Sequence, residues 1–221
     1  MKLDTLWPDG PRFYQQESVF KIGTDSLRLA RFANARSARK AMDLGTGTGV
    51  LAILLALANE NLHVDAIDLS PQAVELTAKN AEENAVATQV FPHVADMREI
   101  RWKFPAGGYD LVIANPPYFP VNTGKRALGE IADAREESCC SLEDITKAAA
   151  YLLRSGGNVA LVHRPERLSE LCVAMTAQGI EPKRLQFAQT DPKKAPNLVF
   201  LEGKRGAKPG LKIEAPLLLE R

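Results

Sequence analysis

A glycine-rich loop between a strand and a helix most constrains the fold of this chain. Residues 40–44 form a short apolar strand, and the sequence DLGTGTG then places Gly45, Gly47 and Gly49 before an apolar helix over 49–58. Glycine permits a tight turn and close approach of a ligand, while the helix N-terminus offers unpaired N–H groups. The loop therefore predicts a ligand site at the end of the first strand of a sheet.

The spacing of the glycines narrows the class of ligand. Dinucleotide sites use G-x-G-x-x-G, whereas this loop reads G-x-G-x-G, and Val50 stands where the third glycine would fall. This spacing disfavours a pyrophosphate cradle. No G-K-[ST] follows, which excludes a P-loop.

Strands alternate with helices along most of the chain, which predicts βαβ units and an α/β fold with helices on both faces of the sheet. The last two strands have no helix between them. We therefore expect a seven-stranded, mostly parallel sheet with one antiparallel strand near the C-terminus, at the end of the sheet. The strands are expected at 40–44, 63–69, 89–95, 109–114, 158–163, 184–189 and 198–202, and the helices at 24–36, 49–58, 71–84, 142–153 and 165–178.

Several helix ends carry recognisable signals. Thr24 or Asp25 is expected to cap the first helix, and Ser70 the helix that begins at 71. Gly156 and Gly157 are expected to end helix 142–153.

The composition favours a soluble protein of one domain. The chain has 221 residues, of which 45% are hydrophobic and 25% charged, and its net charge of +1 gives no general preference for nucleic acid. The three cysteines suggest neither a zinc site nor a disulfide framework, and no stretch resembles a signal core or reaches membrane-spanning length. We expect a single domain over 1–221, a cytoplasmic location, no metal, no membrane partner, and a monomer or weak homodimer.

One acidic residue lies at the end of the second strand and another directly follows the third. Asp68, followed by Leu69, can accept hydrogen bonds from both hydroxyls of a ribose, or it can simply be an acid at a helix N-terminus beside Ser70. Asp96 can bind an adenine amine while Met97 packs on the ring, or it can lie in a solvated turn.

These residues together resemble the S-adenosylmethionine-dependent methyltransferases of the Rossmann-like class. The resemblance rests on Asp43–Gly49 (DLGTGTG), Asp68 and Asp96. It implies a class I methyltransferase fold with residues 37–221 as its core, and S-adenosylmethionine as the cofactor. In that family the glycine loop passes under the methionine part, the second-strand acid holds the ribose, and the third-strand acid meets the adenine. Asp43 suits a cofactor that carries a positive sulfonium and an ammonium group.

Asn115, Pro116, Pro117 and Tyr118 directly follow the fourth strand. An Asn-Pro turn is common at a strand end and could be no more than that. The fourth strand of such a sheet, however, ends in the crevice that holds the ligand. The four residues also resemble the Asn/Asp-Pro-Pro-Tyr/Phe motif of enzymes that methylate planar amines, either adenine N6 or the glutamine amide.

The residue types of this motif fit that chemistry. The Asn115 side-chain oxygen and the Pro116 carbonyl would accept hydrogen bonds from the target amine and favour a pyramidal nitrogen whose lone pair points at the methyl group. The two prolines would hold the carbonyl rigidly. Tyr118 would stack on the planar target, a contact that contributes about 1–3 kcal/mol.

The two ends of the chain suggest a subfamily. Residues 14–32 contain an F-x-x-x-[ST]-D pattern that begins at Phe20, and residues 200–219 read FLEGKRGAKPGLKIEAPLLL. Both segments resemble bacterial adenine-N6 methyltransferases that act on valine tRNA next to the anticodon, and their uncharacterised relatives. The resemblance implies tRNA as a partner and a cofactor-covering helix within residues 1–36. It places Tyr14, Lys21, Thr24 and Asp25 at the cofactor.

Charge gives independent support for RNA. Residues 183–212 contain eight basic and two acidic residues, a local net charge of +6. Such a cluster can neutralise phosphates, although any single lysine in it could belong to a solvated surface. The candidate RNA contacts are Lys193, Lys194, Lys204, Arg205 and Lys208, with Lys125 and Arg126 after the Asn-Pro-Pro-Tyr motif.

Three alternatives stay open. A protein glutamine-N5 methyltransferase shares the motif, but such enzymes carry an extra N-terminal helical domain, whereas the F-x-x-x-[ST]-D pattern here begins at Phe20. A DNA adenine methyltransferase usually needs a sizeable target-recognition region, for which this chain has no room. A non-catalytic cofactor- or RNA-binding module is disfavoured by the intact motif.

Overall fold

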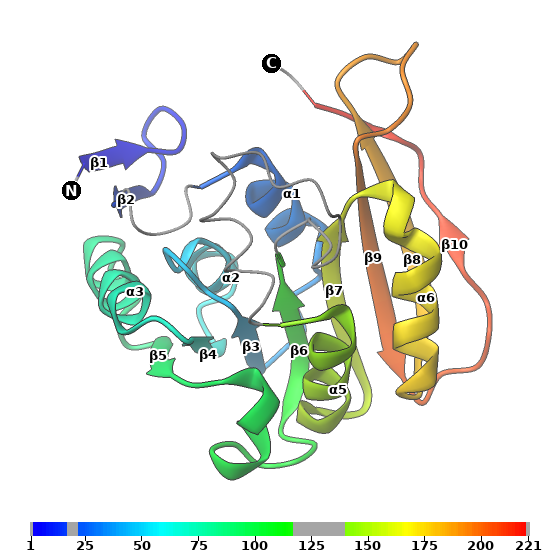
Figure 1. Cartoon of the computed structure of the whole chain (residues 1–221). Coiled ribbons are helices and arrows are strands. Elements are labelled where there is room, and N and C mark those ends of the chain that lie inside the picture. Colours follow the sequence, from blue (N-terminus) through cyan, green and yellow to red (C-terminus); the bar gives the residue numbers. More distant parts are fainter. Residues whose placement is uncertain (1, 17–21, 117–139, 220–221) are drawn as a thin grey trace, which may run out of the picture.

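The structure is an α/β architecture built on one central sheet (Figure 1). It is a computed structural model, and it describes residues 2–16, 22–116 and 140–219. The elements in chain order are β1 (Lys2–Thr5), β2 (Arg12–Gln15), α1 (Thr24–Phe32), β3 (Lys40–Leu44), α2 (Val50–Ala58), β4 (His63–Asp68), α3 (Pro71–Glu83), β5 (Val90–Val94), η1 (Met97–Trp102), β6 (Tyr109–Ala114), α5 (Leu142–Leu152), β7 (Leu153–His163), η2 (Pro165–Arg167), α6 (Leu168–Ala177), β8 (Ile180–Gln189), β9 (Leu198–Arg205), β10 (Lys212–Ile213) and β11 (Leu217–Leu218).

The strand order of the central sheet is β10-β8-β9-β7-β6-β3-β4-β5, and β11 also pairs with β8. Strands β5, β4, β3, β6 and β7 pair in parallel, as the alternation of strands and helices predicts. The seven predicted strands are all present. Two further strands of two residues each, β10 and β11, run along β8 and bring the sheet to nine.

The antiparallel strand is β9, and it lies inside the sheet. It pairs antiparallel with both β7 and β8. The prediction of one antiparallel strand is confirmed, but its expected place at the end of the sheet is wrong. Helix α6 returns the chain so that β8 runs in the direction of β7, one strand away. A hairpin connection, which an antiparallel pair allows, then brings β9 into the gap.

Helices cover both faces of the sheet, as predicted. Alternate residues of β7 show the two cores: Ala160 and Val162 face the core that contains α1 and α2, while Val159 and Leu161 face the core that contains α5 and α6. The central strands β3 and β6 are buried on both faces, which explains their nearly continuous apolar sequences. Among the residues that the structure describes, no helix has the length and apolar character needed to cross a membrane.

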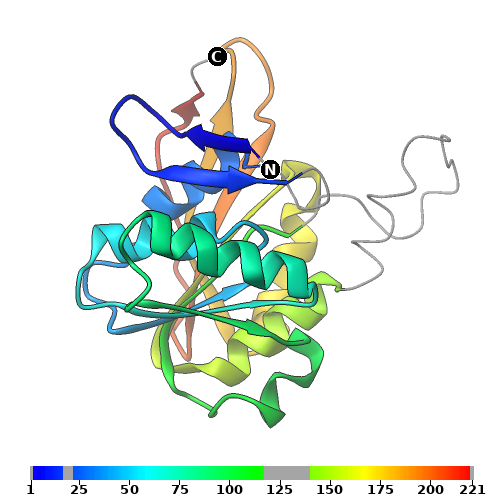
Figure 2. The same cartoon turned by 90° about the vertical axis from the view of Figure 1, so that its left-hand side faces the viewer.

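The N-terminal segment forms a hairpin that the sequence patterns did not indicate. Strands β1 and β2 pair antiparallel and lie over α3 (Figure 2, blue strands above the green helix). Asn84 receives a hydrogen bond from the backbone N–H of Arg12 at 3.0 Å and donates one to its carbonyl oxygen at 2.7 Å. A side-chain amide thus mimics a strand partner for β2 and docks the hairpin on the helix.

Two of the expected helix ends are wrong. Helix α1 has Gly23 as its N-cap and no side-chain cap, so Thr24 and Asp25 belong to its first turn. Helix α5 ends at Leu152, and the chain passes directly into β7 through the two glycines at 156 and 157. Leu153 already pairs with Tyr109 of β6, and the two glycines lie in an irregular stretch between this pair and Leu111–Asn158. The Ser70 cap of α3 is confirmed, because its hydroxyl accepts from Ala73 N–H at 3.3 Å.

Candidate functional site

The glycine loop joins β3 to α2 at the carboxyl edge of the sheet. Gly45, Gly47 and Gly49 have φ of +74°, +56° and +81°, in the left-handed region that favours glycine. A Cβ on Gly49 would lie 2.7 Å from Cγ2 of Thr77, whereas a Cβ on Gly45 would meet no atom within 4 Å. Gly49 therefore permits the close packing of α2 and α3, and Gly45 faces open space that a ligand can enter.

Helix α3 holds the glycine loop in place. The hydroxyl of Thr77 donates to the carbonyl oxygen of Gly47 at 3.2 Å, and Nδ2 of Asn80 donates to that of Thr48 at 2.8 Å. The same Asn80 accepts from the N–H of Tyr14 at 2.7 Å. Sequence reasoning missed Thr77 and Asn80, although two polar residues three positions apart on the buried face of a helix are a usable signal.

Asp43 lies at the end of β3 beneath the loop and is fully buried. Its Oδ2 accepts a hydrogen bond from the Thr46 hydroxyl at 2.7 Å, while Oδ1 has no hydrogen-bond partner among the described residues. Burial raises the pKa of Asp43 to about 7, against the lowering effect of Thr46 and of the Ala52 N–H. A buried carboxylate of this kind fits a ligand that brings positive charge to the loop, because a nearby cation would stabilise its ionised form.

Asp68 accepts hydrogen bonds both from the glycine loop and from the N-terminus of helix α3. Its Oδ2 accepts from the N–H of Gly47 at 2.9 Å, and its Oδ1 accepts from the N–H of Ser70 at 2.9 Å. These contacts fit an acid at a helix N-terminus, as one interpretation of the sequence has it. Ribose binding stays a prediction, for which each carboxylate oxygen keeps a further acceptor position. Leu69, beside it, is 44% exposed and offers an apolar surface next to the carboxylate.

Asp96 follows β5 and is the N-cap of η1, which begins at Met97. The N–H of Ala95 donates to the carbonyl oxygen of Asp68 at 2.9 Å, which brings the two predicted acids to one edge. Asp96 also accepts from Nε of Arg98 at 3.0 and 2.9 Å, and this contact lowers the pKa of Asp96. An adenine amine at this position would share the carboxylate with Arg98.

Asn115 directly follows β6, next to β3 in the sheet. Its Nδ2 donates to the hydroxyl oxygen of Ser26 on α1 at 2.8 Å. Pro116 is buried beside it. The structure thus brings Asn115 and the glycine loop to the same edge of the sheet. Two members of the predicted motif, Pro117 and Tyr118, lie outside the described residues.

The remaining predicted cofactor residues are in the N-terminal segment. Tyr14 packs on α3, with Nζ of Lys79 3.8 Å from its ring centroid and its hydroxyl 3.4 Å from Glu83. Its backbone, rather than its ring, is linked to the glycine loop through Asn80. Thr24 begins α1, and the Asp25 carboxylate accepts from the N–H of Ser26 at 2.9 Å. Lys21 lies outside the described residues.

The predicted RNA-binding residues are split between two edges of the sheet. Lys193 and Lys194 are exposed in the loop from β8 to β9, at the carboxyl edge that carries the glycine loop (Figure 1, orange). Because β9 runs antiparallel, Lys204, Arg205 and Lys208 lie at the opposite edge. The Arg205 guanidinium donates to the carbonyl oxygen of Leu153 at 2.7 Å. Lys125 and Arg126 lie outside the described residues.

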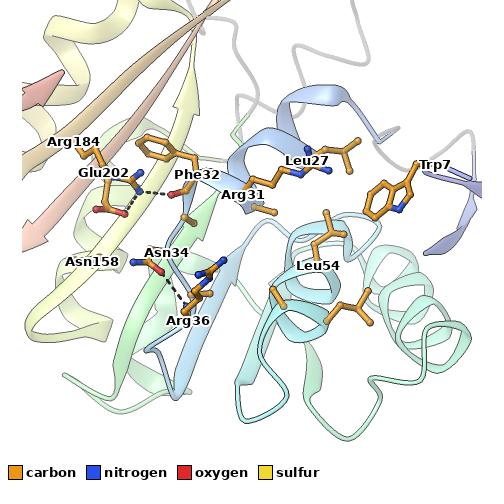
Figure 3. Close-up of a pocket in the computed structure, with 15 residues that line it drawn as sticks. Trp7, Leu27, Arg31, Phe32, Asn34, Arg36, Leu54, Asn158, Arg184 and Glu202 are labelled. Carbon is orange, nitrogen blue, oxygen red and sulfur yellow. Dashed lines mark hydrogen bonds and ion pairs between the residues drawn. The ribbon is translucent and has the colours of Figure 1, made fainter. Parts of the chain in front are cut away.

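A groove of about 900 Å³ lies between α1, α2 and the sheet, and it contains none of the predicted site residues (Figure 3). Near one end, Arg184 donates to the Phe32 carbonyl oxygen and to Glu202 at 2.9 Å, and its guanidinium lies 4.0 Å from the Phe32 ring centroid. Near the other end, Trp7 lies beside Arg31. The Arg184 contacts fasten the C-terminal end of α1 to the sheet.

Comparison with known proteins identifies the family of this chain. The family model of the methyltransferase small domain matches residues 13–173. A protein of Tolumonas auensis named tRNA1(Val) (adenine(37)-N6)-methyltransferase is 36% identical over 190 residues, which cover 85% of this chain and 77% of that protein. A protein of the same name from the Flavobacteriaceae bacterium strain 3519-10 is 32% identical over 152 residues, which cover 67% of this chain and 61% of that protein.

Solved structures share the fold. An Agrobacterium tumefaciens protein described as a predicted O-methyltransferase superposes with a TM-score of 0.71 at 21% identity, over 88% of this chain and 86% of that one. Geranyl diphosphate C-methyltransferase from Streptomyces coelicolor A3(2), solved with S-adenosyl-L-homocysteine, gives 0.60 at 13% identity, over 81% and 77%. The expected class I fold is confirmed, and the chain belongs to the methyltransferase small domain family.

Proposed function

We propose that this methyltransferase transfers a methyl group from S-adenosylmethionine to the exocyclic N6 amine of an adenine in tRNA, in the cytoplasm. The observation that carries the proposal is the position of Asn115. It follows β6 at the same sheet edge as the glycine loop, and its amide is held by Ser26. The names of the relatives support tRNA as the substrate.

The cofactor would lie along the carboxyl edges of β3, β4 and β5, and it supplies an electrophilic methyl group on a positive sulfur. The glycine loop leaves space at Gly45 for its methionine part, and Asp43 beneath the loop favours positive charge there. Asp68 would accept the ribose hydroxyls. Leu69 and Asp96 would bracket the adenine, with the exposed Leu69 side chain packing on the ring.

Asn115 would activate the target amine, whose lone pair is delocalised into the adenine ring. The side-chain oxygen of Asn115 and the carbonyl oxygen of Pro116 would each accept a hydrogen bond from the target amine. This geometry favours a pyramidal nitrogen with its lone pair directed at the methyl group, and preorganised acceptors stabilise the charge that develops. Tyr118 would stack on the adenine, which leaves its own stack to reach the site.

The substrate would approach from the carboxyl edge of the sheet. Lys193 and Lys194 lie exposed at this edge, and we assign them to phosphate contacts near the target base. Lys204, Arg205 and Lys208 are at the far edge, so we do not place them near that base.

One experiment tests the proposal directly. The protein is incubated with S-adenosylmethionine labelled in its methyl group and, in separate reactions, with unmodified tRNA, duplex DNA and a release-factor domain. Labelled N6-methyladenosine from tRNA is the expected product. Label found only in the release-factor domain would transfer the assignment to glutamine methylation, and label only in DNA would overturn the choice of RNA. Asn115→Ala is the control and should show no turnover.

A further inference from the structure

Ser26 occupies a position on α1 at which the helix pattern calls for an apolar side chain. The buried residues of α1 are Ser26, Leu29 and Phe32, spaced three apart along one face. Ser26 is only 4% exposed. A hydroxyl in such a place needs a hydrogen-bond partner, and its oxygen accepts from Nδ2 of Asn115 at 2.8 Å. The polar atom that interrupts the apolar face of α1 is therefore in contact with the proposed catalytic asparagine.

We propose that Ser26 is a positioning residue for methyl transfer, an inference that rests on the proposed function. It holds the NH₂ end of the Asn115 amide against α1, so that the oxygen end is turned toward the amine of the substrate. The two ends of an amide have opposite hydrogen-bonding character, because the nitrogen only donates and the oxygen only accepts. A reversed amide would present hydrogens to an amine that must itself donate.

The helix that carries Ser26 is firmly held, which makes it a suitable support. Phe32 at its C-terminal end packs against Phe200 of β9 with ring centroids 5.6 Å apart. Arg184 covers the Phe32 ring and binds its carbonyl oxygen. Leu29, which lies between Ser26 and Phe32 on α1, is fully buried. A reacting group gains most from supporting residues that are themselves locked by packing, and Ser26 meets this condition.

The first test separates positioning from binding. Ser26→Ala removes the acceptor and should lower kcat by about five- to tenfold, the bias that one net hydrogen bond gives to the amide orientation. The Kd for S-adenosylmethionine and the KM for tRNA should stay within about twofold. Ser26→Thr keeps the hydroxyl and should recover most of kcat. Ser169→Ala, exposed on α6, is the matched control. An unchanged kcat in Ser26→Ala would overturn the proposal.

A double-mutant cycle distinguishes orientation from general support of the loop. In Asn115→Asp both ends of the side chain are acceptors, so no orientation has to be selected. Adding Ser26→Ala to this background should lower its residual kcat by no more than about twofold. An equal loss in both backgrounds would show that Ser26 supports α1 or the loop without orienting the amide, and would refute the proposal.

A third measurement does not depend on activity. In ¹⁵N-labelled protein, the side-chain NH₂ hydrogens of Asn115 should exchange slowly with solvent, because one of them is bound to a buried oxygen. Exchange should become faster in Ser26→Ala and remain slow in Ser26→Thr and Ser169→Ala. Equal exchange in all four proteins would reject the contact itself. If tRNA is not methylated, the proposed function fails, while this result still decides whether Ser26 holds the Asn115 amide.

Discussion

Two buried aspartates lie on adjacent strands, Asp43 on β3 and Asp65 on β4, and their pKa values are shifted in opposite directions. Each is at most 5% exposed. Asp43 lies with the α2 face of the sheet, near its carboxyl edge, whereas Asp65 faces the η1 and α5 side. The pKa of Asp43 is raised to about 7 by burial, while hydrogen bonds and nearby cations lower that of Asp65 despite its burial.

Asp65 is surrounded by partners. It accepts from the Tyr109 hydroxyl at 2.7 Å and lies 2.9 Å from Nε2 of His93, 3.2 Å from Nε2 of His63 and 3.2 Å from Nζ of Lys40. Lys40, His63 and Tyr109 are each the first residue of their strands, so the cluster lies toward the edge opposite the glycine loop. Asp65 thus links its own strand β4 to β3, β5 and β6, and its charge is compensated by these partners, which is the pattern of a structural group.

Asp43 has fewer hydrogen-bond partners than Asp65. Thr46 is its only side-chain partner among the described residues, and its Oδ1 has none. An ionised carboxylate buried without compensation destabilises a fold. Such a cost is typical of functional sites, where a group is kept ready for a charge that arrives with the ligand. Burial alone therefore does not distinguish a candidate binding acid from a structural one, whereas a buried carboxylate oxygen without a hydrogen-bond partner and a raised pKa do.

The largest effect is expected from Asp65→Ala. It leaves the buried Tyr109 hydroxyl without an acceptor, while Lys40 and both histidines are partly exposed and can turn to water. The free energy of unfolding should fall by about 2–3 kcal/mol in urea titrations near pH 7. Cofactor affinity of the folded protein should change little. Asp65→Asn, which keeps an acceptor for Tyr109, should lose less, and a loss of equal size would argue against the hydroxyl as the main cause.

Asp43→Asn should show the reverse pattern. Cofactor affinity is expected to fall by about ten- to a hundredfold in calorimetry, because the site loses the negative charge that favours a cationic ligand. The free energy of unfolding at pH 8 should stay constant or rise. A carboxyl whose pKa is raised in the folded state makes the fold less stable as the pH rises from about 4 to 7, and the neutral amide removes this loss. A clear destabilisation with unchanged affinity would assign Asp43 a structural role.

The pH dependence of cofactor binding should also distinguish Asp43 from Asp65. Below pH 7 the free protein holds a proton on Asp43, and a cationic ligand lowers the pKa of that carboxyl, so binding releases the proton. Affinity should therefore rise by up to about tenfold between pH 6 and 8. In Asp43→Asn the part of this rise that belongs to Asp43 should disappear. Asp65→Asn should keep it, and its loss there would mean that another group titrates.

Much of the fold and of the site could be predicted because its signals are local. The left-handed turn needs glycine at 45, 47 and 49, and each of these appears in the sequence. Asp68 is the last residue of a recognisable strand, and Asn115 directly follows another. A residue that acts within a few positions of its own strand end leaves its mark in the sequence at that point. The parallel sheet likewise follows from the alternation of strands and helices.

The rest depends on contacts between residues far apart in the chain. Ser26 meets Asn115 from 89 residues away, and Asn80 meets Tyr14 from 66 residues away. No local pattern indicates such pairs. The separation of basic residues that are close in the sequence has a related cause. Strand β9 reverses direction inside the sheet, and so it carries Lys204 away from Lys193.

The smallest effect is expected on tRNA binding, from the exposed lysines at the two edges of the sheet. Replacing Lys193 and Lys194 with alanine should raise the KM for tRNA a few-fold and reduce its salt dependence by about one unit of log–log slope for each lysine that contacts a phosphate. The matched control replaces Lys204 and Lys208, which are also exposed but lie at the opposite edge. We expect this control to leave KM and slope unchanged at low salt, where electrostatic contacts are strongest. A loss in the control as large as in the test variant would mean that tRNA contacts both edges of the sheet. The carboxyl edge would then bind the target base without alone determining how the RNA docks.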